Sequence, residues 1–255
     1  MDGIEGRKPV GERPLYGRFA WAYDFVVARP AGGSAEHLAS MLLSCGASRG
    51  SLVLDAGCGT GRYAHGLARF GFRVIGLDRS EALIEQASAR SSSATFVCAD
   101  LLAWHPPEMA DAVLCRGVLN DLIADGDRAT AFAAFAAWLC PGGVLLADVR
   151  DWEATAARYA NEPRHERSAG RHGRTLLFSS ETTPHAGRRL MRVRERYTGT
   201  LHGQAVDDSY EFAMRCWTAG ELREQIAAAG FTSLQLRSGS EAGIAPDRIL
   251  VIAHR

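Results

Sequence analysis

The segment VLDAGCGTGRYAHGLARFGFRVIGLDRS, residues 53–80, contains the strongest structural signal in the chain. It starts as an apolar run and continues into a turn, residues 57–61, in which three of the five positions are glycine. A helical pattern follows over residues 62–71, and a second apolar run over residues 72–78 ends in aspartate. A strand, a glycine-rich turn, a helix and a second strand form a βαβ unit, which predicts a parallel sheet.

The glycine turn predicts a ligand that contains a ribose. Glycine has no Cβ, so a ligand can approach the backbone of the turn closely, and the following helix directs the positive end of its dipole to the same place. Asp78 follows Gly57 at about the twenty-residue spacing with which an acidic residue reaches ribose hydroxyls.

NAD and S-adenosylmethionine both contain a ribose, and two residues separate them. The dinucleotide fingerprint GxGxxG/A ends in a small residue that allows close packing of the helix on the strand, but Arg62 occupies that position here. Asp55 stands just before the turn, where its carboxylate would repel a diphosphate and attract an ammonium and a sulfonium. The charge at Asp55 favours S-adenosylmethionine.

The alternation of short apolar strands with helices predicts the fold class. It continues to about residue 150 and resumes after residue 217, which indicates an α/β, Rossmann-like, doubly wound and mostly parallel seven-stranded sheet. Three β-prone segments with intervening turns predict an inserted antiparallel β subdomain at about residues 174–217. We expect a flexible leader at residues 1–14 and a single domain at residues 15–255. Within the domain, two amphipathic helices at residues 15–29 and 34–45 form an N-terminal helical cover (15–45), and the insertion at about residues 174–217 forms a β lid.

Composition and charge exclude several classes of partner. The 255 residues have a formal net charge of zero, which predicts no general attraction to nucleic acid. No apolar run approaches the roughly 20 residues of a membrane span, so no membrane association is expected. The six cysteines show neither CxxC pairs nor histidines at zinc spacing, which predicts a reduced, cytoplasmic protein without a metal site.

Five motifs in chain order resemble class I S-adenosylmethionine-dependent methyltransferases of the small-molecule type. They are VLDAGCGTG at the first strand, CADLL at the third, DAVLCRGVLND at the fourth, LCPGGVLLADV at the fifth, and AGELREQIAAAGF in a late helix. The resemblance covers roughly residues 50–150 and the chain from residue 217 onward. It implies S-adenosyl-L-methionine as the methyl donor and S-adenosyl-L-homocysteine as the product.

The resemblance also implies roles for individual residues. Asp78 would bind both ribose hydroxyls, Asp100 would accept the adenine amino group, and Leu101 would lie beside the adenine ring. In similar methyltransferases a tyrosine of the leader closes over the carboxylate and sulfonium of the cofactor, and Cys58 would contribute its backbone alone. The predicted cofactor-binding residues are Tyr16, Asp55, Gly57, Cys58, Gly59, Thr60, Gly61, Asp78, Arg79, Asp100, Leu101 and Arg116.

The acceptor is predicted only as a class, a small molecule methylated on nitrogen or oxygen. The Asp/Asn-Pro-Pro-aromatic turn that grips a flipped base in nucleic-acid amine methyltransferases is replaced by CRGVLN. Candidate acceptor contacts are Tyr23, Asn120, Tyr197, Tyr210, Arg215 and Trp217. No general base and no oligomeric state is predicted. Two alternatives remain open, an aminopropyl-type transferase on the same fold and a non-catalytic protein that binds the cofactor.

Overall fold

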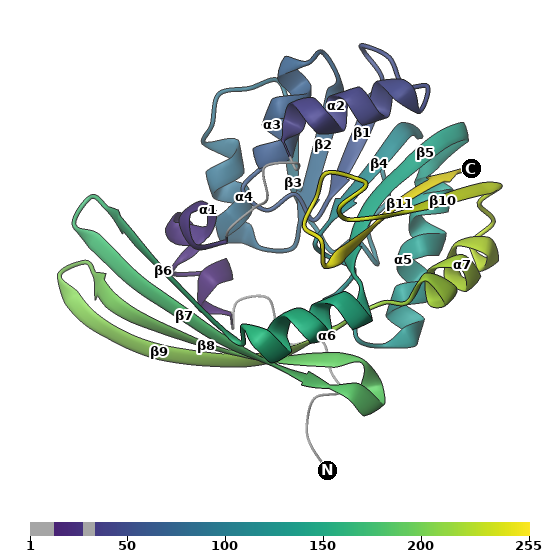
Figure 1. Cartoon of the computed structure of the whole chain (residues 1–255). Helices are drawn as coiled ribbons and strands as arrows, with labels where there is room; N and C mark the ends of the chain where they lie inside the picture. The colour runs from purple at the N-terminus through teal and green to yellow at the C-terminus, as the bar shows by residue number, and fades with distance from the viewer. Residues whose placement is uncertain (1–12, 28–33) are drawn as a thin grey trace.

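A computed structural model describes residues 13–27 and 34–255, so most of the predicted leader lies outside the described residues. Figure 1 shows two sheets, one flanked by helices and the other standing apart from it. The larger sheet has seven strands in the order β10-β11-β5-β4-β1-β2-β3. Its strands are β1 (Leu52–Ala56), β2 (Arg73–Asp78), β3 (Thr95–Cys98), β4 (Ala110–Arg116), β5 (Leu139–Arg150), β10 (Ser233–Ser238) and β11 (Arg248–His254).

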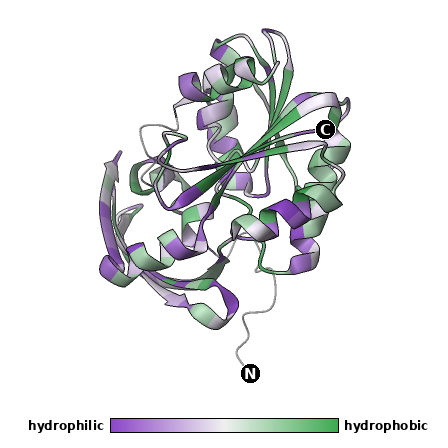
Figure 2. Cartoon of the chain, turned by 45° about the vertical axis from the view of Figure 1, so that its right-hand side comes forward, coloured by the Kyte–Doolittle hydropathy of each residue, from purple (hydrophilic) through white to green (hydrophobic). Residues whose placement is uncertain are grey.

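The predicted doubly wound, mostly parallel sheet is confirmed. Strands β3, β2, β1, β4 and β5 pair in parallel, and β11 runs antiparallel to both of its neighbours. Every residue of β1 is buried, as expected for a central strand covered on both faces. Figure 2 shows the apolar residues concentrated in these central strands.

Helices cover both faces of the large sheet and create two separate cores. Helices α2 and α3 contribute Leu42 and Leu67 to one core, whereas α5 and α7 contribute Phe132 and Ile226 to the other. No helix within the described residues is long and apolar enough to cross a membrane. The longer helices are α2 (Ala35–Ser44), α3 (Arg62–Arg69), α4 (Glu81–Ser88), α5 (Asp125–Trp138), α6 (Trp152–Asn161) and α7 (Ala219–Ala228).

The predicted antiparallel insertion is present between β5 and α7. It forms a four-stranded sheet in the order β6-β7-β8-β9, preceded by α6. The strands are β6 (Arg164–Arg171), β7 (Arg174–His185), β8 (Leu190–Leu201) and β9 (Gln204–Arg215). The Trp217 N–H donates to the Arg150 carbonyl at 2.9 Å, so the insertion leaves and rejoins the large sheet at one place.

The four-stranded sheet begins ten residues before the predicted start at residue 174. Its first strand, β6, has the sequence RHERSAGR and carries polar residues on both faces. The prediction depended on apolar alternation, and an exposed edge strand does not need it.

The N-terminal segment differs from the single helix predicted for residues 15–29. The described part consists of two 3₁₀ turns, η2 (Pro14–Tyr16) and η3 (Ala20–Ala22), and a short helix α1 (Tyr23–Val26). Its aromatic residues form a third core with the inserted sheet, in which the Phe19 ring stacks on Tyr197 with a centroid distance of 5.4 Å. The helix prediction assumed that the apolar residues of this segment form one face of an amphipathic helix. They pack instead in the core that the segment shares with the inserted sheet.

We expect Trp217→Ala to lower the free energy of unfolding by about 3–5 kcal/mol, because the fully buried indole would leave a cavity. Its ring packs edge-on against Phe132, and the Arg128 guanidinium lies 3.2 Å from its centroid. Urea unfolding followed by circular dichroism measures the change. Phe25→Ala is the matched control, because that ring is 53% exposed and its loss should cost less than about 0.5 kcal/mol. Equal losses in the two variants would contradict the core position of Trp217.

Candidate functional site

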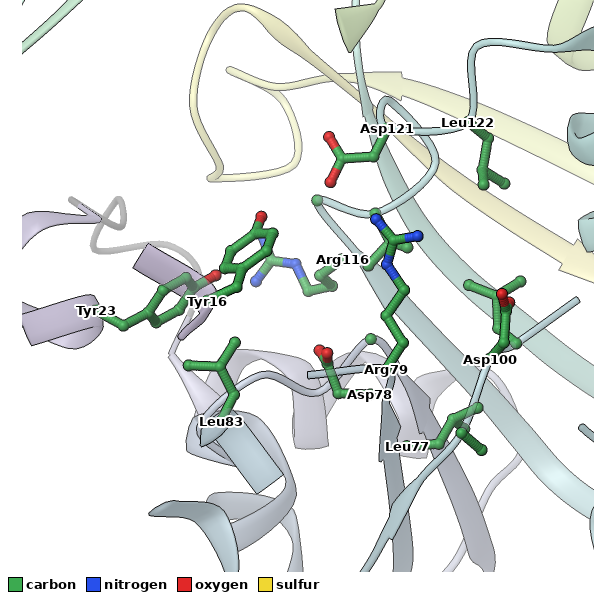
Figure 3. Close-up of a pocket in the computed structure, with 15 residues that line it drawn as sticks. Tyr16, Tyr23, Leu77, Asp78, Arg79, Leu83, Asp100, Arg116, Asp121 and Leu122 are labelled. Carbon is green, nitrogen blue, oxygen red and sulfur yellow. The ribbon is translucent and has the colours of Figure 1, made fainter. Parts of the chain in front are cut away.

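A pocket opens at the carboxyl ends of β1, β2, β3 and β4 (Figure 3). This is the edge of an open α/β sheet where ligands bind, since the loops that follow parallel strands meet there. The wall combines carboxylates, arginines, two tyrosines and apolar side chains. The lining residues are Tyr16, Tyr23, Gly57, Leu77, Asp78, Arg79, Leu83, Ala99, Asp100, Leu101, Arg116, Gly117, Val118, Asp121 and Leu122.

The glycine turn forms the floor of this pocket. The Leu77 carbonyl accepts the N–H groups of Gly57 and Cys58, which fixes the turn against the end of β2. Gly57 has φ +76°, and a Cβ at this position would lie 2.1 Å from Val118 Cγ2. Glycine is therefore required at Gly57 both by backbone conformation and by the close approach of the loop after β4.

Asp78 at the end of β2 connects the turn to the pocket. Its carboxylate accepts the Gly59 N–H at 2.9 Å and the Ser80 N–H at 2.9 Å, which orients both oxygens beside the cavity. Burial raises the pKa of Asp78 above its ordinary value, and the N–H groups of Ser80 and Gly59 oppose this rise. The carboxylate is thus preorganised to accept further hydrogen bonds from a pair of hydroxyls.

Asp100 and Leu101 follow β3 in a tight turn on the same side of the pocket. The Asp100 carboxylate accepts the Leu102 N–H at 2.9 Å, and the Asp100 carbonyl accepts the N–H groups of Ala103 and Trp104. Leu101 is only 7% exposed and lines the cavity beside Asp100. A carboxylate next to an apolar wall suits a flat heteroaromatic ring with an exocyclic amino group.

Two hydrogen bonds hold the N-terminal segment against the glycine turn. Thr60 Oγ1 donates to Asp24 Oδ1 at 2.8 Å, and Ser80 Oγ donates to the Tyr16 carbonyl at 2.7 Å. These contacts place the Tyr16 and Tyr23 rings at the pocket wall, with their centroids 6.0 Å apart.

A buried ion pair joins the same segment to the inserted sheet. Arg13 donates to both carboxylate oxygens of Glu195, at 2.9 and 2.5 Å, and also to Tyr16 Oη at 2.6 Å. Glu195 is 3% exposed and also accepts the Tyr197 hydroxyl at 2.5 Å. Burial raises the pKa of Tyr16, so this phenol stays protonated at neutral pH. The inserted sheet therefore contacts the pocket through Arg13 and Tyr16.

A second buried charge cluster supports the loop after β4. Asp148 accepts from Arg116 Nε at 2.7 Å, from Arg248 Nη1 at 2.5 Å and from the Gly117 N–H at 3.0 Å. Burial opposes ionisation of Asp148, but the guanidinium groups of Arg248 and Arg116 hold its pKa below the ordinary value. Arg116 reaches the pocket wall, and its charge is already paired there with Asp148.

Seven of the residues predicted to bind the cofactor line the pocket together: Tyr16, Gly57, Asp78, Arg79, Asp100, Leu101 and Arg116. The other five lie in or behind the glycine turn: Asp55, Cys58, Gly59, Thr60 and Gly61. Among these, Asp55 is 1% exposed. Burial, together with the charge of Asp55, raises the pKa of the Cys58 thiol and so disfavours the thiolate form.

Of the predicted acceptor contacts, only Tyr23 lines the pocket. Asn120 is a structural link instead: its amide donates to the Arg215 carbonyl at 3.0 Å and its oxygen accepts the Arg150 N–H at 3.2 Å. Arg215 is paired with Asp125 and Glu221. These interactions hold the two ends of the insertion and leave Asn120 and Arg215 outside the pocket wall.

The three predicted aromatic contacts in and after the insertion also serve packing. Trp217 belongs to the large core and does not line this pocket. Tyr197 is fully buried between Phe19 and Phe178, and Tyr210 packs against the same core. No residue of β6–β9 is among those that line the pocket.

Sequence reasoning missed several wall residues, of which Asp121 is the one with ionisable chemistry. Asp121 ends the motif DAVLCRGVLND and stands next to Asn120. Because Asp121 directly follows Asn120, a predicted acceptor contact, its place in the sequence could have indicated that it lies near the pocket. The described residues contain no group of three or more His, Cys, Asp or Glu side chains arranged to hold a metal ion.

The family model for a methyltransferase domain matches residues 53–143, the part of the chain that forms this pocket floor. Residues 53–143 are therefore similar to a methyltransferase domain. A trans-aconitate 2-methyltransferase from Methylobacterium radiotolerans is 38% identical over 102 residues. That similarity covers 39% of this chain and 38% of the relative, so the matched segment spans about two fifths of the curated relative's length.

Solved structures resemble the methyltransferase domain together with its insertion. The sugar N-methyltransferase KedS8 from Streptoalloteichus has a TM-score of 0.75 at 19% identity, covering 100% of this chain and 97% of that one. The amino pentose methyltransferase CalS10 from Micromonospora echinaspora, solved with S-adenosylmethionine bound, has a TM-score of 0.68 at 23% identity, with 93% and 96% coverage. At these identities the likeness establishes a shared fold.

We expect Glu195→Gln to lower the free energy of unfolding by about 3–5 kcal/mol, because Arg13 would lose its buried counter-charge. Hydrogen exchange at residues 13–27 should also accelerate relative to the large sheet. Glu211→Gln is the matched control on the neighbouring strand, since its pairs with Arg192 and Arg194 are exposed and should contribute little to stability. If both variants behaved alike, the ion pair would not hold the segment in place.

Proposed function

We propose that this protein binds S-adenosylmethionine in the pocket and transfers its methyl group to nitrogen or oxygen of a small-molecule acceptor. The observation that carries the proposal is the alignment of Asp78 and Asp100 at the ends of adjacent strands, facing one cavity beside Gly57. A ribose and an adenine need such acceptors at neighbouring strand ends, and the family match covers these residues.

The donors and acceptors of the pocket fit this cofactor. In our assignment Asp78 accepts the two ribose hydroxyls, and Asp100 accepts the adenine amino group with Leu101 against the ring. The aminoacyl end lies over the glycine turn, near the negative charge of Asp55. Tyr16 covers this end from the N-terminal segment, where its neutral hydroxyl is held by Arg13.

Methyl transfer places modest chemical demands on the side chains. Bound S-adenosylmethionine supplies an activated methyl group, and the protein must hold the acceptor atom in line with it and exclude water. The Tyr16–Tyr23 pair and the inserted sheet form the cover that does this in our proposal. The inserted sheet acts as a lid through the Arg13–Glu195 ion pair.

Small molecules are the proposed acceptors, with no role for nucleic acid. The net charge is zero, and the relatives named above act on trans-aconitate or on sugar amines. The protein is proposed to work in the cytoplasm, where all six cysteines would remain as the free thiols found here. An aminopropyl-type transferase and a non-catalytic binding protein are the competing functions, and a screen for a one-methyl mass increase separates methyl transfer from both.

We expect Asp78→Ala to weaken S-adenosylmethionine binding by roughly 10- to 100-fold, the loss of a charge-assisted pair of hydrogen bonds. Isothermal titration calorimetry measures the dissociation constant. Asp78→Asn retains the side-chain shape and one acceptor oxygen, and should fall between wild type and Asp78→Ala. Glu108→Ala removes an exposed partner of Arg73 and serves as the surface control. Unchanged affinity in a folded Asp78→Ala protein would remove the ribose assignment.

We expect activity to be independent of divalent metal. A metal-dependent O-methyltransferase needs a cluster of carboxylate or histidine ligands, and the described residues hold no group of three or more such side chains arranged around one point. The measurement is the rate of methyl transfer after treatment with EDTA, before and after magnesium is added back. Loss of activity with EDTA and recovery with magnesium would contradict the proposal and favour an acceptor with vicinal hydroxyls.

A further inference from the structure

Asp121 lies in the turn after β4 and lines the pocket on the wall formed by that turn. Its N–H donates to the Val118 carbonyl at 2.8 Å, which closes the turn and fixes the backbone of Asp121. Figure 3 shows its carboxylate beside the same open space as the Tyr16 ring and the Arg79 guanidinium.

The Asp121 carboxylate differs from the other acidic groups at this edge of the sheet. Asp78 accepts two backbone N–H groups, Asp100 accepts the Leu102 N–H, and Asp148 is enclosed by two arginines. Within residues 13–27 and 34–255, no hydrogen bond or ion pair reaches the carboxylate of Asp121. A carboxylate that makes no hydrogen bond or ion pair with the described residues, in a partly desolvated pocket, indicates a group that pairs with a ligand.

The charged and titratable groups around Asp121 come from four parts of the fold. They are Arg13 and Tyr16 of the N-terminal segment, Arg79 after β2, Arg150 at the end of β5 and Glu195 of β8. Burial raises the pKa of Asp121 above its ordinary value, the arginines oppose this rise, and Glu195 adds to it. Arg13 is already committed to Glu195, and Arg150 to Asp247.

The strand order places Asp121 at the methyl-transfer end of the proposed cofactor site. Ribose at Asp78 and adenine at Asp100 occupy the ends of β2 and β3, which form one side of the sheet. The aminoacyl end and the sulfonium then lie toward β1 and β4, and Asp121 follows β4. Asp121 is therefore on the side where an acceptor meets the methyl group.

We propose that Asp121 binds the acceptor, and that the acceptor is a small polar molecule with a basic amine. This inference rests on the proposed methyltransferase function and narrows its substrate class. The amine arrives as an ammonium ion and pairs with the carboxylate. A negatively charged acceptor would face repulsion from Asp121. Of the two arginines on the pocket wall, Arg116 is paired with Asp148, and Arg79 already interacts with the charges of Asp78 and Asp121.

Asp121 also receives the proton that the amine must lose. The ammonium transfers one proton to the carboxylate, and the nitrogen lone pair then forms the new N–C bond while the S–C bond breaks and its electron pair stays on sulfur. The product leaves as a methylated ammonium ion, and Asp121 releases its proton to solvent. A carboxylate with a raised pKa accepts that proton more readily than an ordinary aspartate.

The test compares wild type with Asp121→Asn, which keeps the shape of the side chain and removes its charge. The substrates are a panel of amino sugars, the same sugars with hydroxyl in place of amine, and trans-aconitate, scored by mass for one added methyl group. Calorimetry gives the affinity for S-adenosylhomocysteine and the affinity of the resulting complex for the amino sugar. Asp125→Asn is the matched control, since that carboxylate is exposed and outside the pocket wall.

We expect wild type to methylate amino sugars, and Asp121→Asn to lose about 100-fold or more in kcat/KM, the scale of general base catalysis. Its complex with S-adenosylhomocysteine should bind the amino sugar more weakly, whereas affinity for S-adenosylhomocysteine itself should stay within about 2-fold. In wild type, kcat/KM should fall as pH drops through the raised pKa of Asp121, and Asp121→Asn should lack that limb.

Two results would overturn the inference while leaving the methyltransferase function intact. One is methylation of hydroxyl sugars or trans-aconitate in preference to the amines, and the other is full activity of Asp121→Asn on amines. Failure of wild type to bind S-adenosylmethionine or S-adenosylhomocysteine would instead overturn the proposed function itself. The calorimetry and the acceptor panel thus separate the two failures.

Discussion

The Asp78 carboxylate is the contact on which the rest of the site depends. By accepting the Gly59 and Ser80 N–H groups, it fixes the glycine turn against the end of β2. Ser80 in turn binds the Tyr16 carbonyl, and Thr60 of the same turn binds Asp24. A carboxylate that orders the pocket floor is also coupled, through two short hydrogen bonds, to the segment that covers it.

The N-terminal segment, which covers the pocket with Tyr16 and Tyr23, is attached to both sheets. The N-terminal segment shares one small core with the inserted sheet and is hydrogen-bonded to the large sheet, so it lies between the two bodies. The Arg13–Glu195 ion pair connects the N-terminal segment to the inserted sheet, and Arg13 also donates to the Tyr16 hydroxyl at the pocket. A change in the inserted sheet can therefore alter the pocket without any of its own side chains lining the wall.

Much of the fold was predictable because its central strands are buried on both faces and the turn after β1 needs glycine. The alternation of apolar runs with helices predicted the seven-stranded, mostly parallel sheet, and the spacing of Asp78 from Gly57 predicted the pocket floor. Strand β6 was not predictable from periodicity because it is an exposed edge strand, and the 3₁₀ turns were not, because their packing against the inserted sheet replaces a helical pattern. Trp217 and Arg215 looked suitable for an acceptor by residue type, but they are taken up by core packing and by ion pairs. Asp121 was missed although it directly follows the predicted contact Asn120, because the sequence does not show which side chain of that turn faces the pocket.

The central claim is that one pocket, bounded by Asp78, Asp100 and Tyr16, holds the methyl donor with its reactive end toward the loop after β4. A crystal structure of the complex with S-adenosylhomocysteine tests this most directly. The account predicts ribose hydroxyls within hydrogen-bond distance of Asp78, the adenine amino group at Asp100, and the sulfur on the side of Tyr16 and Asp121. Ligand density at another place on the sheet, or the reverse orientation with adenine beneath Tyr16, would contradict it.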